Sequence, residues 1–226
     1  EAADVEARLS DWLPQITAPN APPYLLYLHF NDPHEPYNPR EPWYDSGSYS
    51  GQYADAMSAY DSEISYLDAA LERTWAAIQE GAERRGRSVI LVVLSDHGEA
   101  FGEHGTIGHP GILFREVNRV LMMVHAPEFG VAPGRRHGMV SLVDVVPTVM
   151  EISRLPPLDS VAGLSLLPVL RGGEQGTIQE TELDGRTLYA HRWDPDQLMS
   201  DGSKRELWAA LRGERKVILS PEGVQW

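Results

Sequence analysis

The distribution of apolar and polar residues along the 226-residue chain predicts an alternation of strands and helices. Two largely apolar runs, at 88–94 and 119–127, are typical of strands covered on both faces. A third run, at 22–30, is bounded by prolines and rich in aromatic residues, so we predict a strand there too. Residues 31–43 contain four prolines and should form a stiff loop directly after that strand.

One long helix is predicted over residues 53–78, where apolar residues recur at steps of three or four and form a single stripe. The stripe consists of Tyr53, Met57, Tyr60, Ile64, Leu67, Leu71, Trp75 and Ile78. We expect this stripe to face the core, and we expect Asp61 and Glu63, on or near the polar face, to be solvated. A second helix is predicted over 141–155, with Pro147 in its first turn.

Three short strands are predicted near the C-terminus, at 186–193, 205–213 and 215–220, with a hairpin turn at Gly213. The order strand, helix, strand, strand, helix in the preceding part indicates an α/β fold with a mostly parallel sheet flanked by helices. We therefore expect an α/β core over residues 1–172 and a small antiparallel β subdomain over 173–226.

Composition narrows the classes of partner. The net charge of −14 argues against a nucleic-acid partner, because phosphate contacts need clustered Lys and Arg. No apolar run approaches 18 residues, so we expect no membrane span. The chain has no cysteine, which removes disulfides and a cysteine nucleophile from these residues.

The stretch SDHGEAFGEHG, residues 95–105, follows the predicted strand at 88–94 and is dense in ligand-type side chains. Asp96 offers a hard anionic oxygen and His97 an imidazole nitrogen, and both can bind a divalent metal ion. The alternative is that Asp96 caps a helix and His97 is an ordinary packed residue.

Two further stretches carry candidate histidines. In DPHEP (32–36), prolines flank His34 and fix its backbone, which suits a group that donates a hydrogen bond to an anion or acts as general acid. In GEHGTIGHPG (102–111), glycines surround His104 and His109 and allow close approach to a ligand. Because ligands bind at the carboxyl ends of strands in α/β sheets, we expect the 31–37 and 95–109 loops to meet. Solvated surface loops are the alternative for both.

These stretches, in this order, resemble the sulfatases of the alkaline phosphatase superfamily. The resemblance is carried by YLLYLHFNDPHEPY, YDSEISYLDAALE, VILVVLSDHGEAFGEHG with GHPGILFREVNRVLMMVHAP, PGRRHGMVSLVDVVPTVMEISRL and AGLSLLPVLRG, over residues 24–172. It implies an alkaline-phosphatase-like fold, an enzyme acting on small-molecule or saccharide sulfate esters, and a periplasmic or extracellular location.

The resemblance also implies roles for individual residues. Asp96 and His97 fall where the family has two metal ligands; calcium is the family's usual ion, but the histidine nitrogen leaves manganese, zinc or magnesium open. His34 and His109 fall where family residues contact the sulfate or the leaving oxygen. His104 lies within the matching stretch, and we place it among the substrate-binding candidates.

The family's formylglycine motif, Cys/Ser-x-Pro-x-Arg, does not occur in this chain. We therefore expect the formylglycine and further metal ligands upstream of residue 1, so that the chain is the later part of a catalytic domain and is inactive alone. Two other functions stay open. One is a phosphoryl or phosphonate hydrolase or transferase of the same superfamily, and the other is a non-catalytic sulfatase-like binding module.

Overall fold

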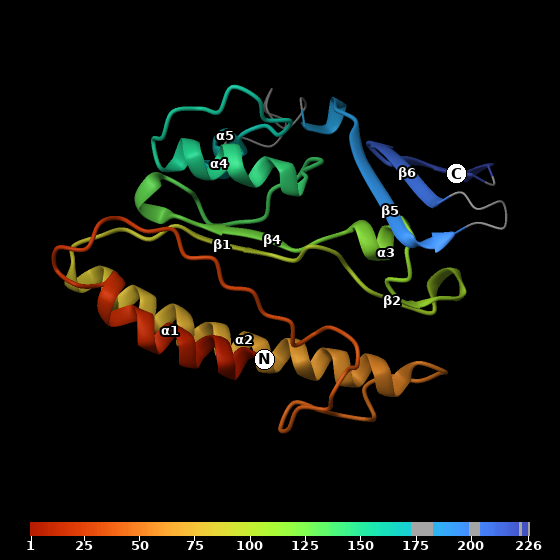
Figure 1. Cartoon of the computed structure of the whole chain (residues 1–226), viewed down its shortest axis with the longest axis horizontal. Helices are drawn as coiled ribbons and strands as arrows, with labels where there is room; N and C mark the ends of the chain where they lie inside the picture. The colour runs from red at the N-terminus through yellow and green to blue at the C-terminus, as the bar shows by residue number, and fades with distance from the viewer. Residues whose placement is uncertain (173–182, 199–203, 222, 226) are drawn as a thin grey trace. The chain divides into compact units, whose positions relative to one another are not determined.

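The chain divides into two compact units, whose residues can be found in Figure 1 by the colour bar. Unit 1 comprises Glu1–Val89 and Phe101–Gly108, and unit 2 comprises Ile90–Ala100 and His109–Trp226. The computed structural model describes residues 1–172, 183–198, 204–221 and 223–225. Within these ranges, no helix has the length and apolar character needed to cross a membrane.

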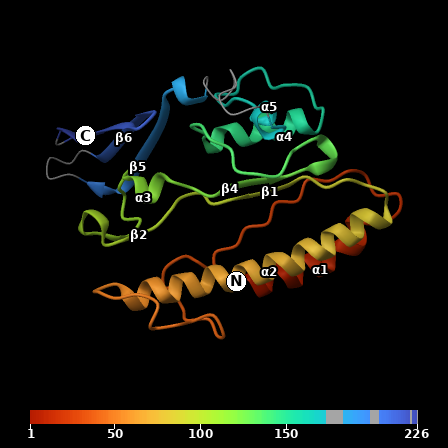
Figure 2. The ribbon, with the colours of Figure 1, turned by 180° about the vertical axis from the view of Figure 1, so that it is seen from behind.

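Unit 1 is built on two helices, α1 (Ala2–Ile16) and α2 (Ala54–Arg84), which lie side by side (Figures 1 and 2). The predicted helix at 53–78 is confirmed by α2, which continues to Arg84. The helices approach closely because small residues line their contact; a Cβ atom on Gly81 would lie 2.4 Å from Cγ2 of Thr17. Arg73 on α2 donates hydrogen bonds to both carboxylate oxygens of Glu6 on α1.

The buried face of α2 differs from the predicted apolar stripe. Ile64 is exposed, whereas Ser62 and Glu63 are fully buried. The expectation that Glu63 is solvated is therefore wrong, and its carboxylate requires polar partners inside unit 1. Asp61 is exposed, as expected, and accepts a hydrogen bond from the Tyr49 hydroxyl.

The strand predicted at 22–30 does not form. Residues 22–30 form neither a helix nor a strand, and two of their apolar side chains are largely exposed, Leu25 at 88% and Tyr27 at 78%. An apolar run indicates strand propensity, but a strand also needs a neighbouring backbone to pair with. The proline-rich stretch that follows contains neither helix nor strand, as predicted.

Unit 2 contains a pair of antiparallel strands, β1 (Leu91–Leu94) and β4 (Met122–His125), in which Val92 lies opposite Val124. Both fall within the predicted apolar runs. Their antiparallel pairing means that the expected mostly parallel sheet is not confirmed in the described residues. Apolar runs identify strands but carry no information on direction, which is set by the chain connections and by the pairing partner.

Two helices, α4 (Val145–Ile152) and α5 (Leu167–Leu170), lie on one side of the β1–β4 pair (Figures 1 and 2). With η3 (Leu142–Asp144), α4 accounts for most of the helix predicted at 141–155, and Pro147 lies in its first turn. The buried core here includes Ile152 and Leu167, packed against Val124.

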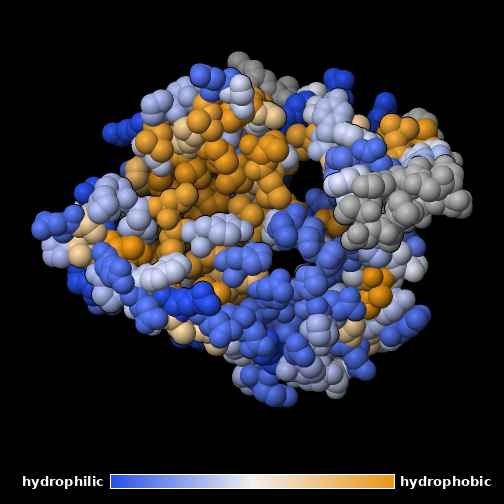
Figure 3. Space-filling view, in the orientation of Figure 1, coloured by the Kyte–Doolittle hydropathy of each residue, from blue (hydrophilic) through white to orange (hydrophobic). Residues whose placement is uncertain are grey.

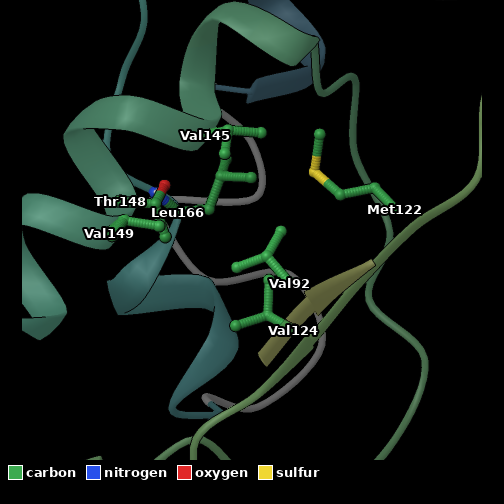
Figure 4. A pocket seen from close by; sticks show the side chains of 7 residues that line it. All are labelled: Val92, Met122, Val124, Val145, Thr148, Val149 and Leu166. Carbon is green, nitrogen blue, oxygen red and sulfur yellow. The ribbon is translucent and has the colours of Figure 1, made fainter. Parts of the chain in front are cut away.

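A small cavity remains between the strands and α4. Figure 4 shows Val92 and Val124 on the strand side of it and Val145 and Val149 on the helix side. Its volume is about 10 Å³, roughly the space that one water molecule needs, and its lining is almost entirely apolar. It is therefore a packing defect and not a ligand site.

One face of unit 2 is strongly apolar. Figure 3 shows apolar side chains gathered over α4 and the neighbouring strands. In this unit Leu121, Met123, Val143 and Val146 are each about half exposed. Contiguous apolar surface on a folded protein usually marks a contact surface.

Four antiparallel strands form the C-terminal sheet in the order β5 (Leu188–Leu198), β6 (Lys204–Arg212), β7 (Arg215–Ser220) and β8 (Gly223–Gln225). The first three confirm the predicted strands. Gly213, with φ of +56°, forms the predicted turn between β6 and β7, where a left-handed backbone favours glycine. One face of the sheet buries Leu207 and Ile218 together with Leu113.

Asp144, at the end of η3, fixes the entry into α4. Its fully buried carboxylate accepts hydrogen bonds from the backbone N–H groups of Ser141 (2.8 Å) and Leu164 (2.9 Å), and from both terminal nitrogens of Arg186. Burial alone would raise the pKa of Asp144, but these hydrogen bonds and the guanidinium charge outweigh it and lower the pKa. The pair thus joins three distant segments of unit 2.

Candidate active site

The site begins where β1 ends. Ser95 is bound to Leu121 through its backbone and its side chain. Its N–H donates to the Leu121 carbonyl (3.2 Å), and its hydroxyl accepts from the Leu121 N–H (3.0 Å). Three residues later the Gly98 N–H donates to the Val117 carbonyl at 2.7 Å. These bonds fasten the turn that carries Asp96 and His97 to the segment before β4.

Gly98 is required at this turn for space. A Cβ atom there would lie 2.0 Å from the carbonyl oxygen of Glu116 and 2.9 Å from that of Arg119. Only a residue without a side chain allows the backbone to pack this closely. The glycine therefore sets the direction in which Asp96 and His97 leave the strand.

Asp96 and His97 present their donor atoms to the same region. Oδ1 of Asp96 lies 3.8 Å from Nε2 of His97, and the Asp96 side chain is 77% exposed. On the other side of the ring, Nδ1 of His97 lies 2.8 Å from the Gly98 carbonyl oxygen. A carbonyl oxygen can only accept, so Nδ1 carries the hydrogen and Nε2 carries a lone pair in the neutral ring.

This donor set fits a divalent metal ion. Two ligands of one ion at ordinary bond lengths are roughly 3 to 4 Å apart, and Oδ1 and Nε2 have that separation. The bond from Nδ1–H to a backbone carbonyl is the support that metal-binding histidines commonly have. Within the described part of the chain, no group of three or more His, Cys, Asp or Glu side chains is arranged to hold an ion.

His109 joins this cluster from the far end of the loop. Its ring centroid lies 4.1 Å from that of His97. Its Nδ1 lies 3.1 Å from Oε1 of Glu99, whose side chain is only 5% exposed. Asp96, His97, Glu99 and His109 thus form one cluster in unit 2, with a carboxylate behind one of its two imidazoles.

His34 lies in unit 1, on the exposed surface of the proline-rich loop. Its Nδ1 faces the Glu35 carbonyl oxygen at 2.7 Å, and its backbone N–H donates to the Asn31 carbonyl. Both of these contacts are made within the loop.

A buried ionic group anchors that loop at both ends. Asp32 accepts a hydrogen bond from the Ala2 N–H (3.1 Å), and Arg40 lies within 3.6 Å of Asp32 and 3.4 Å of Glu63. The Arg40 N–H donates to Ser62 Oγ at 2.9 Å. These contacts fix the loop to α2.

Glu63 is the least solvated member of this group. Burial raises the pKa of the Glu63 carboxyl, while hydrogen bonds from Asn38 and the charge of Arg40 partly offset that rise. Ionisation of this carboxyl therefore costs stability, because the buried charge loses its hydration.

His104 lies between Glu99 and His109 in the sequence but belongs to unit 1. It is exposed and has a positive φ of 53° within η1 (Glu103–Gly105). Neighbouring Glu103 accepts a hydrogen bond from the Phe101 N–H, and that bond lowers the Glu103 pKa. Glu103 thus shapes the loop.

Sequence patterns identified neither Glu99 as a member of the unit 2 cluster nor Glu63 as a buried acid of unit 1. A signal for Glu99 was present, since it directly follows the DHG turn in a short loop that returns to His109. Nothing in the helical period distinguishes Glu63 from the solvated acids beside it.

Comparison with known proteins places the chain among sulfatases. A family model described as Sulfatase matches residues 3–154. An arylsulfatase of Clostridium perfringens is 24% identical over 167 residues, which cover 72% of this chain and 33% of the relative. A choline-sulfatase of Rhizobium meliloti is 28% identical over 172 residues, 74% of this chain and 31% of the relative.

A solved structure, that of the phosphonate monoester hydrolase of Agrobacterium radiobacter, superposes with a TM-score of 0.59 at 22% identity. The match covers 76% of this chain and 34% of that one, and at this identity it shows a shared fold alone. The chain spans about a third of the length of each of these three proteins.

Proposed function

The chain belongs to the sulfatase family, and we propose that the full-length protein containing it is a sulfuric ester hydrolase. The observation that supports this most strongly is the unit 2 cluster, in which an Asp-His pair suited to a metal ion lies against a second, carboxylate-backed histidine. Such a cluster can neutralise a sulfate group and supply a proton to a leaving oxygen.

We assign Asp96 and His97 as ligands of one divalent metal ion. When bound, the ion would polarise the sulfate oxygens and stabilise negative charge. Calcium is the family's usual ion, and the nitrogen ligand keeps manganese, zinc and magnesium as alternatives. The chain holds no Cys/Ser-x-Pro-x-Arg motif, so the formylglycine generally used by the family would lie outside these 226 residues.

We assign His109 and His34 as catalytic residues. During ester cleavage a nucleophilic oxygen from outside these residues would bond to sulfur as the bond between sulfur and the leaving oxygen breaks. The leaving oxygen keeps the electron pair of the broken bond and takes up a proton. A protonated imidazole can donate that proton and can also offset charge on the sulfate. The glycine-flanked His104 is retained as a substrate-binding candidate.

The substrate is proposed to be a small-molecule or saccharide sulfate ester. The two curated relatives are named for different alcohols, an aryl alcohol and choline, so they support the sulfate group and leave the alcohol open. Substrate alcohols are usually selected by loops outside the reacting centre.

Activity of the full-length protein on matched esters tests this proposal. The same nitrophenol is presented as its sulfate, phosphate and phenylphosphonate ester, with divalent metal supplied. We expect the sulfate ester to be cleaved with the highest kcat/KM. Preference for the phosphate or phosphonate ester would support the phosphoryl alternative, and metal-independent sulfate binding without cleavage of any ester would support a binding module.

A further inference from the structure

The Glu99 carboxylate contacts the ring of His109 on the side that determines its tautomer. A neutral imidazole has one N–H donor and one acceptor, and the hydrogen bond at one nitrogen decides which role the other takes. Oε1 of Glu99 lies 3.1 Å from Nδ1 of His109 and, as a carboxylate oxygen, accepts from an Nδ1–H. Nε2 is then the nitrogen that carries the lone pair or the transferable proton.

The surroundings hold this pair in place. The Glu99 side chain is almost fully buried, and the His97 ring lies 4.1 Å from the His109 ring at a 37° tilt, which limits rotation about the His109 side chain. A buried carboxylate beside an imidazole is a strong acceptor, because few waters compete for it. The contact with Glu99 therefore favours the Nδ1–H tautomer, and the packing against His97 limits the orientation of the ring.

We propose that Glu99 is a positioning residue of the site, which holds His109 in the Nδ1–H tautomer and directs Nε2 toward the substrate sulfate ester. The inference rests on the proposed function for its catalytic consequence, but the tautomer itself is independent of activity. Groups that orient metal-binding histidines typically contribute about 10- to 100-fold to affinity or activity, and we expect a contribution of the same order from Glu99 through His109.

Histidine-selective ¹⁵N labelling of the full-length protein tests the tautomer directly. In the unaltered protein we expect the His109 ring, assigned by comparison with His109→Asn, to show a protonated Nδ1 and an unprotonated Nε2 when neutral. In Glu99→Ala the ring should lose this preference, whereas Glu99→Gln, whose amide oxygen can still accept, should retain part of it. A purely structural role for Glu99 would not move these ring signals.

Kinetics of the same variants complete the test. We expect Glu99→Ala to lower kcat on a sulfate ester by about 10- to 100-fold with little change in KM, and Glu99→Gln to lower it less. The matched control is Glu128→Ala, an exposed carboxylate of the same unit, whose kcat should stay within about twofold of that of the unaltered protein. Thermal unfolding of each variant confirms that it folds.

The outcomes separate the two proposals. An Nε2–H tautomer in the unaltered protein, or an unchanged tautomer and kcat in Glu99→Ala, would overturn the role of Glu99. Absence of sulfate ester cleavage by the unaltered protein, with the Nδ1–H tautomer present and lost in Glu99→Ala, would overturn the proposed function and support the positioning of His109 by Glu99.

Discussion

Oδ1 of Asp96 and Nε2 of His97 lie 3.8 Å apart, although their residues are adjacent in the chain and directly follow a strand. In a continuing strand, neighbouring side chains point to opposite faces. Here the strand ends at Leu94, and the Gly98 turn brings both donor atoms to one side. The separation is that of two ligands on one ion.

Metal affinity should therefore depend on this pair. In the full-length protein we expect His97→Ala to weaken binding of the activating divalent ion about 100-fold or more. Loss of a group that supports a ligand already lowers metal affinity by about 10- to 100-fold, and loss of the ligand itself should lower it at least as much. Isothermal titration with manganese or calcium measures the change. His137→Ala, in an exposed loop, is the matched control, and equal affinity in both variants would contradict the assignment.

Gly98→Ala should destabilise unit 2. Its Cβ atom would lie 2.0 Å from the Glu116 carbonyl oxygen, so the backbone must shift, at a cost of about 1–3 kcal/mol. Gly185→Ala is a suitable comparison, since nothing lies within 4 Å of a Cβ atom there. Urea unfolding of both variants measures the difference; identical midpoints would show that the turn accommodates a side chain.

The ion pair of Asp144 and Arg186 should make stability fall in acid. The native pKa of Asp144 lies below its ordinary value of 3.8, so the contribution is fully present above that value and is lost as pH falls through the native pKa. We expect Asp144→Asn to reduce the fall of the unfolding free energy with decreasing pH between about pH 4 and 2. Exposed Asp159→Asn should leave the acid slope as it is; a slope unaffected by Asp144→Asn would argue against the pair.

Glu63 should show the opposite pH dependence. Its native pKa is raised above the ordinary 4.5, so its contribution is fully present below 4.5 and is lost as pH rises through the native pKa. At pH 7 we therefore expect Glu63→Gln to be at least as stable as the unaltered protein. Glu63→Ala, which removes the partner of Asn38 and Arg40, should cost about 1–3 kcal/mol. A Gln variant as unstable as the Ala variant would contradict this.

The fold was predictable where a pattern is local. The apolar period of α2 and the glycine turn between β6 and β7 each depend on a few neighbouring residues, so the sequence predicts both. The direction of β1 against β4 and the absence of a strand at 22–30 depend on pairing between distant segments, which no local period encodes.

The site divides in the same way. Asp96, His97 and His109 stood out because their residue types and glycine neighbours are unusual at the end of a strand. Glu99 of the cluster contacts His109, ten residues away, and the buried Glu63 of unit 1 contacts Asn38 and Arg40, more than twenty residues away. The residue type alone does not show whether an acidic side chain is solvated or buried against a partner.

The rate of sulfate release by His109→Gln in the full-length protein tests the central claim most directly. The variant is compared with the unaltered protein on two sulfate esters, one with an alkyl alcohol and one with an acidic phenol as leaving group. If His109 donates a proton to the leaving oxygen, kcat should fall about 10²- to 10⁴-fold on the alkyl sulfate and much less on the phenyl sulfate, whose leaving group needs no proton. An equal or negligible loss on both esters would contradict the account.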